Sequence, residues 1–198
     1  YRGAQRVFKG ALIYAVIAGG IVALFCMFGS AILIPANMAN ARLALQVLSP
    51  TIFLSGILGV FRGYFQAYRN TMPTSISQIL EQIANASIAL LMVHFMQVNF
   101  SGASGDVQQR WEAAGATMGT GAGVLSALLL MLAIYGLNRR YIRRRIAKDR
   151  GSHDESYSQV LRLIVLIASP IILSSFIYNV NGYINSYMYS SIMGYRGV

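Results

Sequence analysis

Residues 10–41 read GALIYAVIAGGIVALFCMFGSAILIPANMANA, and this stretch decides the fold class. It contains no Asp, Glu, Lys or Arg. The hydrocarbon core of a bilayer is about 30 Å thick, and a helix needs roughly 20 apolar residues to cross it. In lipid the backbone polar groups must be satisfied within the segment, so we expect the run to cross as a helix. The stretch predicts a first membrane span at about 11–33.

Similar runs recur along the 198 residues. The expected spans are 11–33, 43–61, 75–98, 113–137 and 163–180, with the start of another at 183–198. Hydrophobic residues make up 56% of the chain and charged residues 11%, whereas soluble domains carry roughly 25% charged residues. We therefore predict an all-α, polytopic membrane helix bundle, cut from a longer protein of transporter size.

The formal net charge of +10 is distributed as a topology signal. Seven of the sixteen Lys and Arg residues fall between Arg139 and Arg150, within an expected cytoplasmic basic loop at 138–158. Most of the others border alternate connections between the spans, and Lys and Arg in short loops stay cytoplasmic. This predicts a multi-pass protein whose N-terminal end is cytoplasmic. The same distribution argues against a nucleic-acid partner and for contact with anionic membrane lipids.

The sequence offers no chemistry for a metal, a cofactor or an enzyme. Cys26 is the single cysteine and lies in an apolar run, and with His94 and His153 it cannot build a metal cluster. No glycine-rich phosphate loop, HExxH or paired intramembrane acids occur. We expect no metal site, no cofactor and no catalytic residue.

Glu81 is the one acidic residue in an expected span. Gln78 and Asn85 share roughly its helix face, at spacings of three and four residues. Ionisable groups within spans are costly, so they line a cavity or pair with a partner. Two interpretations stay open: a cavity-lining acid, or an ion pair with Arg62 or Arg69 near the membrane surface.

Prolines and glycines also recur within the spans. Pro50 and Pro170 each remove a backbone hydrogen bond and predict helix kinks. Small residues repeat at four-residue spacing, which favours close helix packing in lipid. The glycines expected at packing surfaces are Gly59, Gly63, Gly115, Gly119 and Gly123.

Three stretches resemble a known family. Residues 59–82, GVFRGYFQAYRNTMPTSISQILEQ, resemble the pattern FRGYFQG, a short turn, then PTAISQxxEQ in polysaccharide-biosynthesis flippases related to stage V sporulation protein B. Residues 114–123, AGATMGTGAG, and the proline-containing segment 169–175, SPIILSS, resemble later helices of that family. These flippases belong to the multidrug/oligosaccharidyl-lipid/polysaccharide exporter superfamily. The chain departs from their pattern at Ala67, where relatives usually have Gly, and at Asn185, where they often have Asp.

The resemblance implies two helical halves, of which this chain would cover the third to seventh helices and the start of the eighth. It implies a flippase or exporter in the bacterial cytoplasmic membrane that moves a polyprenyl-diphosphate-linked glycan by alternating access, with a coupling ion possible. Arg62, Gln78, Glu81 and Asn85 would then lie along the substrate pathway, with Arg62 meeting the diphosphate. Two alternatives stay open: a multidrug/cation antiporter of the same fold, and a membrane glycan polymerase.

Overall fold

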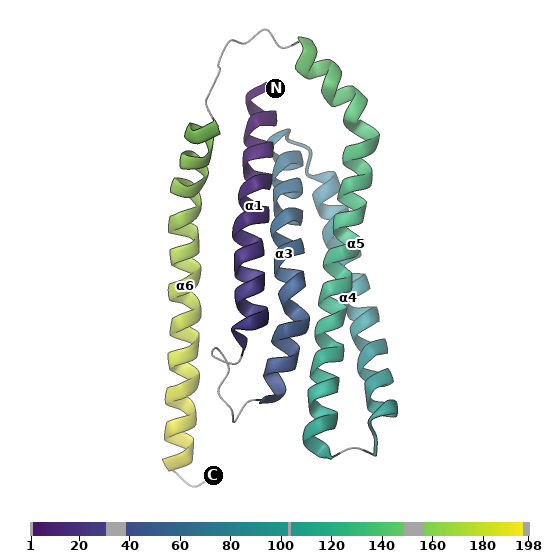
Figure 1. The fold of residues 1–198 in the computed structure, drawn as a ribbon, viewed down its shortest axis with the longest axis vertical. Helices are drawn as coiled ribbons and strands as arrows, with labels where there is room; N and C mark the ends of the chain where they lie inside the picture. Colours follow the sequence, from purple (N-terminus) through teal and green to yellow (C-terminus); the bar gives the residue numbers. More distant parts are fainter. Residues whose placement is uncertain (1, 31–38, 103, 149–156, 196–198) are drawn as a thin grey trace. The chain divides into compact units, whose positions relative to one another are not determined.

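The computed structural model describes residues 2–30, 39–102, 104–148 and 157–195 (Figure 1). The helices are α1 (Arg2–Phe28), α3 (Ala39–Ala67), α4 (Met72–Asn99), α5 (Gly105–Lys148) and α6 (Tyr157–Tyr195). In these described residues every element is a helix, and five helices are long and apolar enough to cross a membrane. The prediction of an all-α membrane helix bundle is confirmed.

The membrane-length segments are Gly3–Phe28, Arg42–Ala67, Met72–Asn99, Val107–Arg140 and Ser158–Gly182. Each contains most of one expected span and extends it by several residues. The first segment begins at Gly3 and so includes Arg6 and Lys9, which lie before the expected span. Charged residues interrupt an apolar run, but they do not end a helix. The last residues of the expected first span, 31–33, lie outside the described residues.

Helix α5 corrects the expected loop at 138–158. The helix continues through Lys148, so the first part of that segment is helical, and residues 149–156 lie outside the described part. No Pro or Gly lies between Leu137 and Lys148, and Arg and Lys are good helix formers. The basic residues mark where the span leaves lipid, but the helix ends later.

Helix α6 differs from the expectation of a new segment at 183–198. It continues unbroken through Tyr195, past both Pro170 and Gly182. Glycine is frequent in membrane helices and no charged residue intervenes before Arg196. Pro170 leaves the carbonyl of Leu166 without its helical N–H donor, and the hydroxyl of Ser169 donates to that oxygen at 3.4 Å. The kinks expected at Pro50 and Pro170 stay predictions.

The chain divides into two units, of which α6 forms the second with its flanking residues. In the first unit α5 packs along both α3 and α4, and α1 packs along α3, whereas α3 and α4 make few contacts with each other. The two helices therefore meet mainly near their shared turn. Figure 1 shows the beginning of α1, the α3–α4 turn and the C-terminal part of α5 at one end of this unit.

We call this end of the first unit the basic end, because Arg6, Lys9, Arg62, Arg69 and Arg139 lie there. An aromatic cluster joins three helices just inside it. The ring of Phe8 (α1) lies 5.3 Å from that of Phe61 (α3) and 5.5 Å from that of Tyr135 (α5), between ring centroids. The Gln5 amide donates to the Tyr135 hydroxyl at 3.3 Å. These contacts fix α3 next to α5 and α1, and so set the position from which Arg62 extends.

Candidate functional site at the α3–α4 turn

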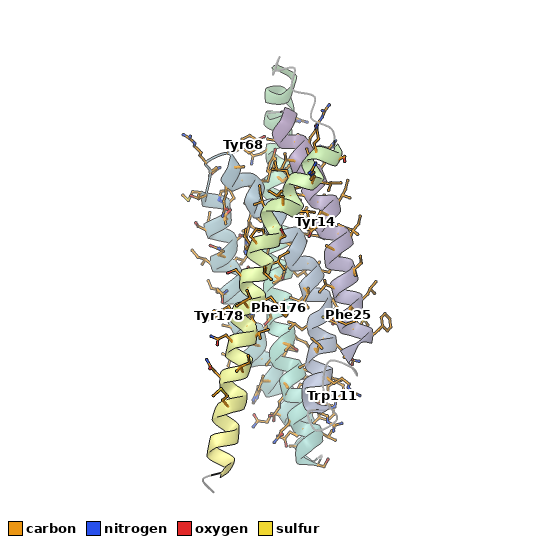
Figure 2. The ribbon with its side chains drawn as sticks, turned by 90° about the vertical axis from the view of Figure 1, so that its left-hand side faces the viewer. Tyr14, Phe25, Tyr68, Trp111, Phe176 and Tyr178 are labelled. Carbon is orange, nitrogen blue, oxygen red and sulfur yellow. The ribbon has the colours of Figure 1, made fainter. Side chains whose placement is uncertain are left out.

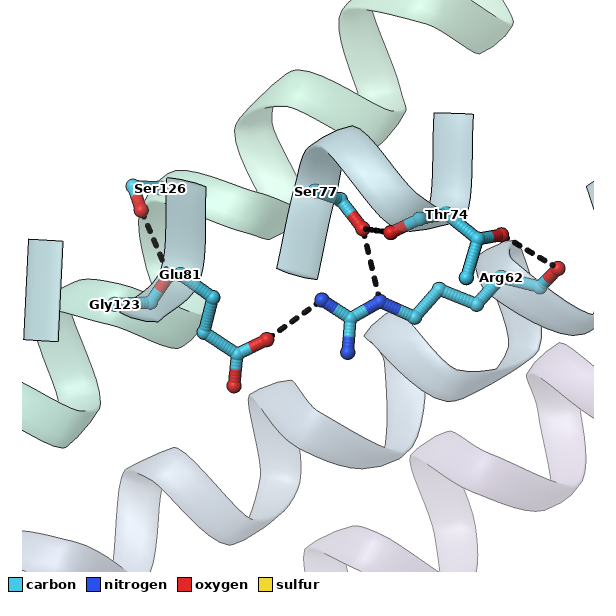
Figure 3. A network of polar contacts seen from close by, with 6 residues as sticks. All are labelled: Arg62, Thr74, Ser77, Glu81, Gly123 and Ser126. Atoms are coloured by element: carbon cyan, nitrogen blue, oxygen red, sulfur yellow. Dashed lines mark hydrogen bonds and ion pairs between the residues drawn. The ribbon is translucent and has the colours of Figure 1, made fainter. Parts of the chain in front are cut away.

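Arg62 and Glu81 form an ion pair that connects α3 with α4. Arg62 lies one and a half turns before the end of α3, and Glu81 lies about two and a half turns into α4. Nη2 of Arg62 is 2.6 Å from Oε2 of Glu81, with side-chain exposures of 18% and 19% (Figure 3). Of the two interpretations left open for Glu81, the structure shows the ion pair, and the partner is Arg62. Both side chains are therefore partly exposed, so another molecule can contact them.

Ser77 completes the contacts of the Arg62 side chain. Nε of Arg62 donates to Oγ of Ser77 at 3.0 Å, and that hydroxyl donates to the carbonyl oxygen of Thr74 at 2.7 Å. The Ser77 side chain is fully buried, with 0% exposure. The Thr74 hydroxyl lies 3.5 Å from the backbone oxygen of Arg62, which places the start of α4 against α3. Figure 3 shows Ser77 and Glu81 on the Arg62 guanidinium, and Thr74 on Ser77 and on the Arg62 backbone.

The turn between α3 and α4 sets this geometry. The N–H of Asn70 donates to the oxygen of Phe65, and the N–H of Arg69 donates to that of Gln66, at 3.2 and 2.8 Å. These are the two bonds of a Schellman motif, which closes a helix with one residue in the left-handed region. That residue is Arg69, with φ 58°. Pro73 follows in the first turn of α4, where a missing N–H costs nothing.

Gln78 and Asn85 do not join the ion pair. Gln78 is exposed on α4, while Asn85 is half-buried against α5. The Thr120 hydroxyl lies 3.5 Å from Oδ1 of Asn85, and a Cβ on Gly123 would approach the Asn85 Cβ at 3.0 Å. Of the four residues expected along a substrate pathway, the structure brings together Arg62 and Glu81. The pathway itself stays a prediction for all four.

The expected packing glycines divide into two groups. A Cβ on Gly115 would lie 3.1 Å from the backbone of Met92, and one on Gly119 would lie 2.6 Å from the nitrogen of Ala89. With Gly123 they lie where α5 meets α4. Gly59 and Gly63 differ, because a Cβ on either would meet nothing within 4 Å. No other helix of the first unit therefore packs against them. Both are exposed on α3, on a face that the other helices of the first unit leave open.

Sequence reasoning missed Ser77 and Thr74. Ser77 lies four residues before Glu81, so the two share a helix face. That spacing could have indicated that Ser77 lies beside the ion pair. Serine is common in membrane helices, however, and the role of Ser77 depends on where Arg62 lies. No group of three or more His, Cys, Asp or Glu side chains that could hold a metal ion occurs in the part of the chain that the structure describes.

Comparison with known proteins gives one distant relative. The chain is 23% identical over 205 aligned residues to Stage V sporulation protein B of Bacillus subtilis. The alignment covers 100% of this chain and 37% of that protein, so the chain spans little more than a third of its relative's length. No protein-family model and no solved structure matches the chain. At this identity the similarity supports a multi-pass membrane protein related to a flippase-like family, and no finer assignment.

Proposed function

We propose that this chain is part of a transporter that moves a lipid-linked oligosaccharide or peptidoglycan precursor across the bacterial cytoplasmic membrane by alternating access. The observation that carries the proposal is the Arg62 guanidinium, held by Glu81 within a membrane-length hairpin while remaining partly exposed. Charged groups inside spans mark substrate or ion pathways. The similarity to Stage V sporulation protein B, which extends over this whole chain and 37% of that protein, supports the same proposal.

Arginine suits a diphosphate because its planar fork donates two parallel hydrogen bonds to phosphate oxygens. In this proposal Arg62 receives the diphosphate of a polyprenyl-linked glycan near the basic end, which would face the cytoplasm. Gln78 and Asn85 would serve the polar headgroup further along α4, while the polyprenyl tail stays in lipid. The cycle needs no covalent chemistry, and an ion gradient or the membrane potential would drive it.

The ion pair also separates the proposal from its nearest rival. A multidrug/cation antiporter uses an acidic group to attract a cationic drug or coupling ion. The membrane-length segments contain two acidic residues, Glu81 and Glu112, and Glu112 lies near the start of α5. Glu81 is already neutralised by Arg62. An Arg that remains partly accessible favours an anionic substrate.

The test uses the full-length protein in its native cell. Depletion should cause polyprenyl-diphosphate-linked precursors to accumulate in the inner leaflet, measured with leaflet-specific enzymatic labelling. Wild type should restore the outer-leaflet pool, and Arg62→Ala and Glu81→Ala should not. Arg69→Ala is the matched control, because it removes the same charge from the exposed turn without touching the pair. An unchanged precursor distribution with altered sensitivity to cationic drugs would overturn the proposal in favour of the antiporter.

A further inference from the structure

The Arg62 guanidinium has two edges that can donate a pair of parallel hydrogen bonds, and both are occupied. One edge consists of Nε and Nη2, and the other of Nη1 and Nη2. On the first edge, Nε donates to the buried hydroxyl of Ser77 at 3.0 Å. Figure 3 shows the Glu81 carboxylate on the second edge, where its Oε2 accepts from Nη2 at 2.6 Å. A phosphate therefore gains two parallel bonds to Arg62 only when one of these partners leaves.

Glu81 is the partner that can leave. The Ser77 side chain is fully buried, and its hydroxyl also donates to the Thr74 carbonyl at 2.7 Å. The Glu81 side chain is partly exposed. Among the described residues, its carboxylate makes its polar contact with the guanidinium alone. A rotation of the Glu81 side chain thus opens the edge of Nη1 and Nη2, while Ser77 keeps its bond to Nε and holds the guanidinium in place.

The Glu81 carboxylate and a substrate phosphate compete for this edge. Both are anions, and both bind a guanidinium through the same fork of N–H groups. Because Glu81 is attached to α4 beside Arg62, it competes at a high effective concentration that does not depend on dilution. The affinity of Arg62 for any phosphate is therefore lower than that of the same guanidinium without Glu81.

We infer that Glu81 is an internal competitor of the substrate, which leaves Arg62 when a phosphate binds there and displaces the phosphate when it returns. This inference rests on the proposed function, because it concerns the same arginine and the same polyprenyl diphosphate. A transporter must release its substrate as well as bind it, and a guanidinium without a competing anion would retain a diphosphate for longer. Between transport cycles the same carboxylate neutralises Arg62 within the span.

The experiment measures equilibrium binding and dissociation with the full-length protein in nanodiscs of zwitterionic lipid. The probes are a short-chain polyprenyl diphosphate and the polyprenyl alcohol of the same length. Glu81→Gln removes the competing charge and should bind the diphosphate about tenfold more tightly, the value of one charge-assisted hydrogen bond at the low end of its range. Dissociation of the diphosphate should slow, and alcohol binding should stay unchanged. Damage to the fold would weaken binding instead.

Glu81→Asp separates competition from simple repulsion between anions. Aspartate keeps the negative charge, but it is shorter by one methylene, so its carboxylate lies about 1.5 Å further from the guanidinium. Competition needs the contact, so Glu81→Asp should also bind the diphosphate more tightly than wild type. Repulsion needs only the charge, so it would leave Glu81→Asp at the wild-type affinity. If Glu81→Gln does not fold, Glu81→Asp carries the test.

Glu112→Gln is the matched control, because it removes the same charge from the other acidic residue of the membrane-length segments. Glu112 accepts from Gln108 at 2.8 Å near the start of α5, at the end opposite the α3–α4 turn (Figure 1). This variant should leave both affinities unchanged. A double-mutant cycle gives a second check. In the Arg62→Ala background, Glu81→Gln should no longer raise the diphosphate affinity, because the competition acts through Arg62.

The proposed function and this inference fail in different ways. A wild-type protein that binds the diphosphate no better than the alcohol would overturn both. A wild type that prefers the diphosphate and loses the preference in Arg62→Ala supports the proposed function. If Glu81→Gln then binds the diphosphate no more tightly than wild type, the inference alone is overturned. A gain that is absent in Glu81→Asp, persists without Arg62 or is matched by Glu112→Gln would also overturn it, since repulsion would explain the gain.

Discussion

At the scale of single residues, Arg69 carries a backbone conformation that its side chain disfavours. Its φ of 58° lies in the left-handed region, where non-glycine residues cost of order 1–3 kcal/mol. The two hydrogen bonds of the Schellman motif hold it there and keep the start of α4 close to α3. Ala67, two residues earlier, is the last residue of α3 and has an ordinary helical conformation.

We therefore expect opposite effects from two glycine substitutions in this turn. Arg69→Gly should stabilise the protein by about 1 kcal/mol, because glycine adopts positive φ without a steric penalty. Ala67→Gly should destabilise it by up to about 1 kcal/mol, the difference in helix propensity. Thermal unfolding in detergent measures both. A destabilised Arg69→Gly would show that its side chain contributes more than its backbone conformation costs.

The Arg62–Glu81 pair shows how far residue-scale prediction could go. The cost of an unpaired charge in lipid required a partner for Glu81, and the short turn limited the basic candidates to Arg62 and Arg69. Choosing between them needed the rotation of α3 about its axis and the direction of the turn. The left-handed residue that sets this direction is an Arg, so no glycine in the sequence marked its place.

At the scale of elements, α5 holds α4 through glycines that leave no room for a side chain. A Cβ on Gly119 would lie 2.5 Å from the Cβ of Ala89 and 2.7 Å from its Cα. Backbone atoms cannot yield as a flexible side chain would. Helices in lipid associate by such close packing, since lipid removes the hydrophobic drive. The spacing of Gly115, Gly119 and Gly123 predicted a packing face, but the same pattern at Gly59 and Gly63 meets no other helix of the first unit.

The two groups of glycines give a matched pair of variants. Gly119→Ala should force α4 away from α5 and destabilise the protein by about 1–3 kcal/mol, as overpacking does. Gly59→Ala should be neutral or stabilising by up to about 1 kcal/mol, because alanine has the higher helix propensity and meets nothing there. Denaturant titration of the full-length protein in micelles compares them. A large loss from Gly59→Ala would reveal a packing partner outside the first unit.

At the scale of the molecule, the first unit has aromatic residues near both ends. Tyr64, Tyr68 and Tyr135 lie at the basic end, and Trp111 stacks on Phe100 at the other, with 5.0 Å between ring centroids. Figure 2 shows Tyr68 and Trp111 toward opposite ends. From Trp111 to Tyr135 α5 rises about 36 Å, close to the thickness of a bilayer core. Tyr and Trp favour such interfaces.

This arrangement predicts the accessibility of each end in a membrane. With Cys26 replaced by Ser, a cysteine at Ser101 should react with a membrane-impermeant maleimide in intact cells. A cysteine at Asn70 should react only after permeabilisation, because the basic end is expected to face the cytoplasm. Both residues are exposed on short connections. The reverse labelling pattern would place the basic end outside and remove Arg62 from the side where a cytoplasmic substrate arrives.

By itself, the sequence determined that the chain is a set of membrane-spanning helices and that its basic residues alternate between connections. Apolar length and charge act locally, so they can be read without the fold. Only the tertiary structure decided that Arg62 rather than Arg69 pairs with Glu81, that Ser77 holds the guanidinium, and that within the first unit one glycine repeat packs while the other does not. These depend on how each helix is rotated toward its neighbours, which the close packing of α5 against α3 and α4 sets.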